Sequence, residues 1–164
     1  MKKASPFEVS RILCAVDFSE ISNLALRYAA ACATAFAARL TVFHAERFEL
    51  PAYFTPGQIE DITRQVKALR RDAKGFLRQH TRAVLGPLAA DLALTHVVTE
   101  TNAADGVLAT AREQSCDLIV LGTHGGSGVK RLWLGSVAEK VVRQADVPVL
   151  VARQKQHELI DTSQ

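Results

Sequence analysis

Short runs of apolar residues alternate along the chain with longer stretches in which apolar positions recur every three or four residues. The runs are nearly continuous, as expected of strands that are covered on both faces of a parallel sheet. They lie at Ile12–Val16, Leu40–Ala45, Leu94–Val98, Leu118–Leu121 and Val147–Val151. Five strands are therefore predicted, and a helical pattern separates each one from the next.

The stretches between the runs have the periodicity of amphipathic helices. The predicted helices cover residues 20–37, 57–82, 103–114 and 136–144. The positions expected to face the core are Ile21, Leu24, Ala25, Tyr28, Cys32 and Ala35; then Ile59, Ile62, Val66, Leu69, Ala73 and Phe76; then Ala104, Val107, Leu108 and Ala111; and finally Val137 and Val141. The segment Arg47–Pro56 is a predicted loop.

This alternation of strand and helix predicts an α/β fold with an open five-stranded parallel sheet, doubly wound and Rossmann-like, with helices on both faces. Residues 10–153 would form the domain, with tails at 1–9 and 154–164. Pro148 removes a backbone donor, which predicts that the last strand lies at a sheet edge or pairs irregularly at this residue. An apolar edge there favours pairing with a partner strand, although the C-terminal tail could cover it instead.

The composition argues against several other classes of protein. With 48% hydrophobic and 23% charged residues, the chain is unlike a disordered protein. The stretch Ala29–Ala38 is too short to span a bilayer, and the N-terminal lysines are not followed by the apolar segment of a signal peptide. A net charge of +3 with scattered basic residues argues against a nucleic-acid partner. We expect a soluble, cytoplasmic protein that binds neither membranes nor nucleic acid.

The cysteines Cys14, Cys32 and Cys116 are odd in number and widely spaced. They fit reduced thiols better than a disulfide framework or a zinc site. We expect Cys14 and Cys32 in the core and Cys116 nearer the surface.

The first candidate for ligand chemistry follows the first predicted strand. In open parallel sheets, ligands bind at the carboxyl ends of the strands, near the point where strand order reverses. The strand ends in Ala15-Val16-Asp17-Phe18-Ser19, where Ser19 is a predicted N-cap. Asp17 could accept a hydrogen bond from a ribose hydroxyl, or it could only support the turn and the helix dipole. Position alone favours neither role.

Glycines mark the second candidate. Five of the nine lie between residues 122 and 135, namely Gly122, Gly125, Gly126, Gly128 and Gly135. The glycine segment follows a predicted strand, and Gly135-Ser136 begins the last predicted helix. Backbone amides and the helix dipole could therefore hold a phosphate there. The alternative is a surface loop whose glycines only permit turns. The P-loop and dinucleotide-binding signatures are both absent from the sequence.

The spacing Gly122-x-x-Gly125, nine residues, Gly135-Ser136 resembles the ATP-binding branch of the universal stress protein family, as does the Ala15–Ser19 opening. The resemblance covers about residues 10–152. It implies an ATP-binding dimeric regulatory protein of the stress response, with Mg²⁺ or Mn²⁺ accompanying the nucleotide. The implied ATP-binding residues are Asp17, Ala45, Gly122, Gly125, Gly126, Ser127, Gly135, Ser136 and Val137. The implied homodimer forms through the last strand, at Val147, Val149, Leu150 and Val151.

In this resemblance Asp17 holds the ribose, the backbone near Ala45 meets the adenine, and the glycine segment lines the phosphates. The chain departs from the family where Thr101-Asn102-Ala103 replaces a frequent Gly-x-Pro, which changes the turn before the third helix. Ala45 is also smaller than the branched residue common at its position.

Several other polar and aromatic residues have two possible roles. His124 could touch a phosphate or a metal-bound water, but an exposed structural role is commoner in such loops. Lys130 and Arg131 could counter phosphate charge or face solvent. His44 and His96 lie within apolar strands and are expected to be satisfied core residues. Trp133 is expected to anchor the loop.

Two other functions suit the predicted fold. A slow ATP-hydrolysing or phosphoryl-transferring enzyme would need a positioned base, carboxylates for a metal and a cationic clamp. Asp17 is the only obvious acidic candidate, so we assign no catalytic residue and no protein metal site. A phospho-acceptor receiver domain would need an aspartate after the third strand. The chain reads Val98-Thr99-Glu100-Thr101 there, which argues against this function.

Overall fold

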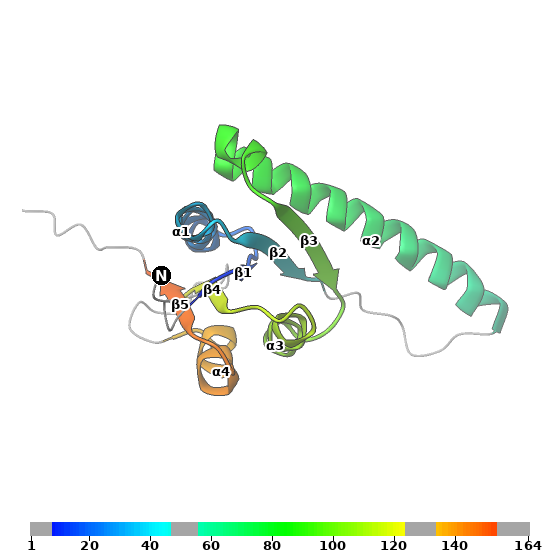
Figure 1. Cartoon of the computed structure of the whole chain (residues 1–164). Coiled ribbons are helices and arrows are strands. Elements are labelled where there is room, and N and C mark those ends of the chain that lie inside the picture. Colours follow the sequence, from blue (N-terminus) through cyan, green and yellow to red (C-terminus); the bar gives the residue numbers. More distant parts are fainter. Residues whose placement is uncertain (1–7, 47–55, 124–133, 154–164) are drawn as a thin grey trace, which may run out of the picture.

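Within the residues that it describes, the computed structural model contains five strands, four α-helices and one 3-10 helix (Figure 1). These residues are 8–46, 56–123 and 134–153, and between 56 and 70 only the backbone and the Ile62 side chain are described. The elements are β1 (Arg11–Ala15), α1 (Glu20–Phe36), β2 (Arg39–Ala45), α2 (Pro56–Leu85), η1 (Gly86–Ala90), β3 (Leu94–Thr99), α3 (Ala103–Glu113), β4 (Leu118–Gly122), α4 (Ser136–Gln144) and β5 (Val149–Ala152). Every predicted helix and strand is present, whereas η1 was not predicted.

All strands run parallel, in the order β3-β2-β1-β4-β5. The chain builds outward from β1 through β2 to β3, and then crosses back to add β4 and β5 on the other side. Strand order therefore reverses between β1 and β4, which pair through Ile12–Leu118, Leu13–Ile119 and Cys14–Val120. The predicted doubly wound α/β fold is confirmed, and its switch point lies between these two strands.

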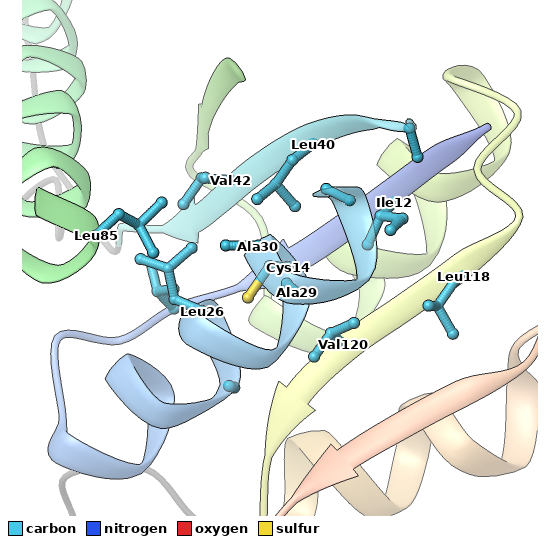
Figure 2. Close-up of a cluster of buried hydrophobic side chains, with 14 of the residues drawn as sticks. Ile12, Cys14, Leu26, Ala29, Ala30, Leu40, Val42, Leu85, Leu118 and Val120 are labelled. Atoms are coloured by element: carbon cyan, nitrogen blue, oxygen red, sulfur yellow. The ribbon is translucent and has the colours of Figure 1, made fainter. Parts of the chain in front are cut away.

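The sheet separates two hydrophobic clusters. Helices α1 and α2 cover one face, and α3 and α4 cover the other (Figure 1). Side chains alternate between the faces along each strand, so that Ile12 and Cys14 of β1 point toward α1, while Leu13 points toward α3 and α4. Figure 2 shows the first cluster, in which Leu26, Ala29 and Ala30 of α1 lie against the strands.

The buried face of α1 matches the predicted one only in part, since Ala25 is buried and Leu24 and Cys32 pack against the first cluster. The buried residues are Ser22, Ala25, Leu26, Ala29, Ala30 and Ala33. Tyr28 is instead 48% exposed, and Ala35 is exposed as well. In a helix this rich in alanine, apolar residues occur on every side, so periodicity does not fix the orientation. Small side chains face the strands because they allow α1 to lie close to the sheet.

Other burial predictions have mixed outcomes. The predicted α3 positions are all buried, as is Val141, and Val137 packs against the second cluster. In α2 the prediction was wrong at Phe76, which is 55% exposed while the neighbouring Leu77 is buried.

The cysteine predictions can also be compared with the structure. Cys14 is buried and Cys32 is half-buried against the first cluster, as expected. Cys116 was expected nearer the surface but is buried, because it packs against the second cluster. Burial raises the pKa of the Cys116 thiol to about 11. All three thiols are free.

Helix α3 lies close to the sheet because residue 106 has no side chain. A Cβ atom on Gly106 would lie 2.7 Å from the ring of Phe43 and 2.7 Å from Oγ1 of Thr101. Glycine is therefore required here by close approach, and a larger residue would force α3 away from β2.

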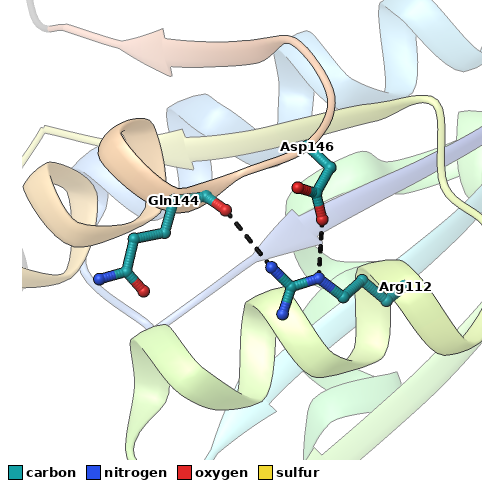
Figure 3. A network of polar contacts seen from close by, with 3 residues as sticks. All are labelled: Arg112, Gln144 and Asp146. Atoms are coloured by element: carbon teal, nitrogen blue, oxygen red, sulfur yellow. Dashed lines mark hydrogen bonds and ion pairs between the residues drawn. The ribbon is translucent and has the colours of Figure 1, made fainter.

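Two exposed ion pairs join α3 to the α4 region. Asp105 accepts from Nζ of Lys140 at 2.7 Å. At the other end, Arg112 donates to Asp146 at 2.7 Å and to the Gln144 carbonyl at 3.5 Å (Figure 3). Exposed pairs of this kind contribute little stability individually.

Asp117 closes the amino end of the sheet. Its Oδ2 accepts from the backbone N of Ser10 at 2.8 Å, from Oγ of Ser10 at 3.2 Å and from the backbone N of Arg11 at 2.9 Å. Burial alone would raise the pKa of Asp117, but these hydrogen bonds, with the positive charge of Arg11, hold the pKa below its usual value. The contacts join the entry of β1 to the entry of β4.

The last strand lies at an edge of the sheet, as predicted from Pro148. Strand β5 pairs with β4, and the Pro148 carbonyl just before it accepts from the backbone N of Ile119 at 3.1 Å.

In the described ranges, no helix combines the length and apolar character needed to cross a membrane.

Candidate functional site

The predicted site residues that the structure describes lie at the carboxyl ends of neighbouring strands. Asp17 follows β1, Ala45 ends β2, and Gly122 ends β4. Since β2, β1 and β4 are adjacent and parallel, these residues lie along one edge of the sheet. The structure therefore brings together segments that are far apart in the sequence, around the switch point.

Asp17 is oriented by the turn that starts α1. Its Oδ1 accepts from the backbone N of Ser19 at 3.1 Å and from Oγ of Ser19 at 2.5 Å. Oγ of Ser19 in turn accepts from the backbone N of Ser22 at 3.3 Å, which confirms the predicted N-cap. The turn-supporting role of Asp17 is thus observed, and the same contacts fix the carboxylate at the strand end.

The start of α4 is fixed beside the end of β4. The backbone N of Thr123 donates to the Ala152 carbonyl at 3.0 Å, and the backbone N of Gly135 donates to the Thr123 carbonyl at 2.7 Å. Gly135 is the N-cap residue and Ser136 is the first helical residue, exposed at the surface. The first N–H groups of α4, and the positive end of its dipole, therefore lie at the same sheet edge as Gly122.

The helices differ in how they begin. Ser19 caps α1, and Asn102 caps α3 by accepting from the backbone N of Ala104 at 3.1 Å. Asn102 therefore supplies the cap of the third α-helix. Among the described residues, no side chain caps α4 at Gly135. An N-terminus of this kind is suited to an anion.

The two described glycines of the motif do not supply left-handed backbone. The positive-φ glycine in the described ranges is Gly86, whereas Gly135 has φ −62°. Gly122 is explained by close approach, because a Cβ there would lie 3.1 Å from the Ile21 side chain. Left-handed backbone is therefore not the reason for glycine at Gly122 or Gly135.

For the other predicted ATP-binding residues that the structure describes, Ala45 and Val137, the structure shows packing contacts. Ala45 is half-buried against the second cluster and pairs with Thr99, and Val137 packs against that cluster too. The predicted residues that lie outside the described ranges are His124, Gly125, Gly126, Ser127, Gly128, Lys130, Arg131 and Trp133. In the described part of the chain, no group of three or more His, Cys, Asp or Glu side chains could hold a metal ion.

The expectation that His44 and His96 are satisfied is confirmed. Nδ1 of His44 lies 2.8 Å from the Val16 carbonyl, which only accepts, so this nitrogen donates. Nε2 of His96 lies 3.2 Å from Oγ1 of Thr81, whose own proton is donated to the Leu77 carbonyl. Burial, together with the positive charges of Arg78, Lys74 and Arg82, lowers the pKa of His96 to about 4.

A cluster of rings next to Asp17 was not predicted from the sequence. The Phe18 ring centroid lies 4.4 Å from that of His44, 5.0 Å from Phe76 and 4.9 Å from His80. Burial and the neighbouring His44 lower the pKa of His80. Phe18 and His44 are the sequence neighbours of Asp17 and Ala45, which are predicted site residues, and this adjacency was the signal that the sequence contained. The two α2 residues carry no such signal.

Comparison with known proteins matches the chain to one family over almost the whole domain. The sequence model of the universal stress protein family matches residues 8–153, which is most of the chain. The chain belongs to the universal stress protein family. One relative, a universal stress protein from Thermus aquaticus encoded in the 3' region of a QAH/OAS sulfhydrylase, is 35% identical over 142 residues, covering 87% of this chain and 97% of the relative.

Solved universal stress proteins have the same fold. UspA from Lactobacillus plantarum is 27% identical, with a TM-score of 0.69 over 89% of this chain and 99% of its own. A universal stress protein solved in complex with cAMP is 22% identical, with a TM-score of 0.59 over 89% of this chain and 98% of its own. These structures support the Rossmann-like universal stress protein fold for this chain.

Proposed function

We propose that this universal stress protein binds ATP at the carboxyl edge of its sheet and acts as a dimeric regulatory protein of the stress response. The observation that carries the proposal is the convergence of Asp17, Gly122 and the start of α4 beside the β1/β4 switch point. A nucleotide needs a ribose acceptor and a phosphate site within one ligand length. Asp17 is the proposed ribose acceptor, and the start of α4 is the proposed phosphate site.

The chemistry of the edge suits the parts of ATP. The Asp17 carboxylate, fixed by both donors of Ser19, is an acceptor for ribose hydroxyls. The N-terminus of α4, at Gly135, Ser136 and Val137, offers backbone N–H groups and a positive dipole end to the phosphates. The proposed adenine position is near Ala45. The proposal assigns Gly125, Gly126 and Ser127 to the phosphates by the family resemblance.

A divalent cation would accompany the nucleotide. Mg²⁺ commonly binds through one or two carboxylates, substrate phosphates and water. Asp17 is the acidic residue that we assign to the ligand, and the described residues contain no group of three or more His, Cys, Asp or Glu side chains that could hold a metal. We therefore assign Mg²⁺ or Mn²⁺ to the phosphates of bound ATP, where the cation would neutralise their charge.

The dimer is proposed through β5. This strand is an edge of the sheet, and an unpaired edge can add a strand from a second copy. Val147 and Val149 pack against the second cluster and Leu150 against the first, so Val151 is the substitution site that least affects the core. Val151→Lys should convert a dimer to a monomer in analytical ultracentrifugation, with thermal unfolding as the control for folding. A dimer that survives would place the interface elsewhere.

A cytoplasmic location is also part of the proposal. The three cysteines are free, as expected in a reducing compartment. The location is tested by fractionation of the native host cell.

The nucleotide itself can be tested on freshly purified protein. Denaturation followed by ion-exchange chromatography should release ATP in a fixed ratio to protein, and added ATP should raise the melting temperature of the emptied protein. Release of nothing, with no thermal shift, would refute the proposal. Multiple turnovers of labelled ATP would instead support a slow hydrolase on this fold.

A further inference from the structure

The ring cluster next to Asp17 is built from three separate parts of the chain. Phe18 follows β1, His44 lies in β2, and Phe76 and His80 lie in α2. Phe18 is its centre, with ring centroids at 4.4 to 5.0 Å from the other three. Such distances are those of attractive tilted and edge-to-face ring pairs. Helix α2 therefore contacts the residue directly after Asp17.

Phe18 has an unusual backbone conformation. Its φ is 66°, in the left-handed region that bulky residues rarely adopt. Such strain persists only where the surrounding structure holds it, and it is frequent at binding sites. Here the backbone turns so that the Phe18 ring packs under α2, while Asp17 keeps its contacts to Ser19.

The neighbours of Phe18 are themselves fixed. Nδ1 of His44 donates to the Val16 carbonyl at 2.8 Å, and Nε2 of His80 donates to Oδ1 of Asn23 at 2.7 Å. The backbone N of Asp17 donates to Oγ of Ser22 at 3.3 Å. The path from α2 to Asp17 therefore consists of direct contacts, with Phe18 as the shared link.

We propose that Phe18, held by Phe76 and His80 of α2, is a positioning residue for Asp17, so that docking of α2 and nucleotide affinity are coupled. The inference rests on the proposed ATP site. By reciprocity, bound ATP should also stabilise the docked α2. The residue that reveals this coupling is Phe76, because it is 55% exposed and lies on α2 rather than at the sheet edge.

The test measures ATP affinity by isothermal titration calorimetry. Phe76→Ala should weaken binding about 5- to 10-fold, within the usual range for coupling between sites, and Phe76→Tyr should restore it. Phe36→Ala is the matched control, since Phe36 is 51% exposed on α1 and has no ring contact in the described structure. This control should bind ATP like the wild type.

A double-mutant cycle separates positioning from general loosening of the fold. If Phe76 acts through Asp17, adding Phe76→Ala to Asp17→Asn should cause little further loss of affinity. Hydrogen exchange of residues 76–85 should slow when ATP binds to the wild type, and slow less in Phe76→Ala.

The outcomes are distinguishable. Wild-type protein that binds no ATP overturns the proposed function, and the inference with it. Wild-type binding with an unchanged affinity in Phe76→Ala overturns the inference alone. Equal losses in Phe36→Ala and Phe76→Ala, or independent effects in the cycle, also overturn it.

Discussion

Asp117 and Asp17 lie at opposite ends of the sheet, one before β4 and the other after β1, and their contacts differ in range. The Asp117 carboxylate accepts from Ser10 and Arg11, which are 107 and 106 residues away in the sequence. The Asp17 carboxylate accepts from Ser19, two residues on in the sequence. The amino-end aspartate joins distant segments and so stabilises the fold. The carboxyl-end aspartate is oriented locally, beside the switch point where a ligand would bind.

The helix starts at the carboxyl end extend this comparison. Ser19 and Asn102 cap α1 and α3, whereas no side chain in the described ranges caps α4. Because of this contrast, experiments can distinguish the role of the amino end of the sheet from the role of its carboxyl end. Changes at the amino end should alter stability, and changes at the carboxyl end should alter binding.

The largest expected effect is at the start of α4. Ser136→Glu places a negative charge beside the proposed phosphate position, and about 4 kcal/mol of repulsion at 4 Å near the protein surface is enough to weaken ATP binding by about 100-fold or more. Stability should not fall, because glutamate is favourable in the first turn of a helix. Calorimetric titration measures the affinity, and Ser136→Gln is the uncharged control. An unchanged affinity in Ser136→Glu would contradict the phosphate assignment.

The next effect should appear in stability rather than in binding. Asp117→Ala removes three hydrogen bonds from the amino end and should lower the free energy of unfolding by about 2 kcal/mol. Urea denaturation gives this value, and ATP affinity, measured on the folded variant, should stay the same. If Asp117→Ala leaves the protein fully stable, or lowers its ATP affinity, the assignment of stability to the amino end and binding to the carboxyl end is contradicted.

A smaller effect is expected at the opposite aspartate. Asp17→Asn retains the size of the side chain but loses its charge, so ATP affinity should fall about tenfold, which corresponds to about 1.4 kcal/mol. Equilibrium dialysis measures the change, and the free energy of unfolding should change less than it does in Asp117→Ala. If the larger loss is in stability, Asp17 serves the turn rather than the ligand.

A further effect concerns pH and His96, which lies on the edge strand β3. The pKa of His96 is lowered from 6.5 to about 4 in the folded protein. As pH falls below 6.5, the unfolded chain is protonated at His96 before the folded protein is. The contribution of His96 to the free energy of unfolding is therefore fully present above pH 6.5 and is lost as pH falls toward about 4. His96→Gln should flatten the decline of melting temperature over this range without abolishing it, since His80 also has a lowered pKa. An equally steep decline in His96→Gln would show that other groups cause it.

Much of the fold could be predicted from the sequence because its signals are local. Continuous apolar runs marked the strands, Ser19 and Gly135 marked helix starts, and Pro148 marked the edge strand. The orientation of α1 was predicted only in part, since alanines occur on all its sides: Ala25 is buried as expected, but Tyr28 is exposed. The burial of Cys116 depends on how α3 and β4 pack together, which no local pattern contains.

The candidate site could be predicted only in part. Asp17, Gly122 and Gly135 were proposed from position and spacing and Ala45 from the family resemblance, and the sheet order brings these residues to one end of the sheet. The contact of Phe18 with Phe76 joins residues far apart in the sequence and depends on where α2 docks. It therefore required the structure.

The central claim is that nucleotide binds at the carboxyl edge of the sheet, and NMR titration tests it most directly. Amide resonances of the ¹⁵N-labelled protein would be followed as ATP is added. We expect the largest shift changes at Asp17, Ala45, Gly122, Gly135 and Ser136, with Ser10, Arg11 and Asp117 unchanged. Shifts concentrated at the amino end, or no shifts at saturating ATP, would contradict the account.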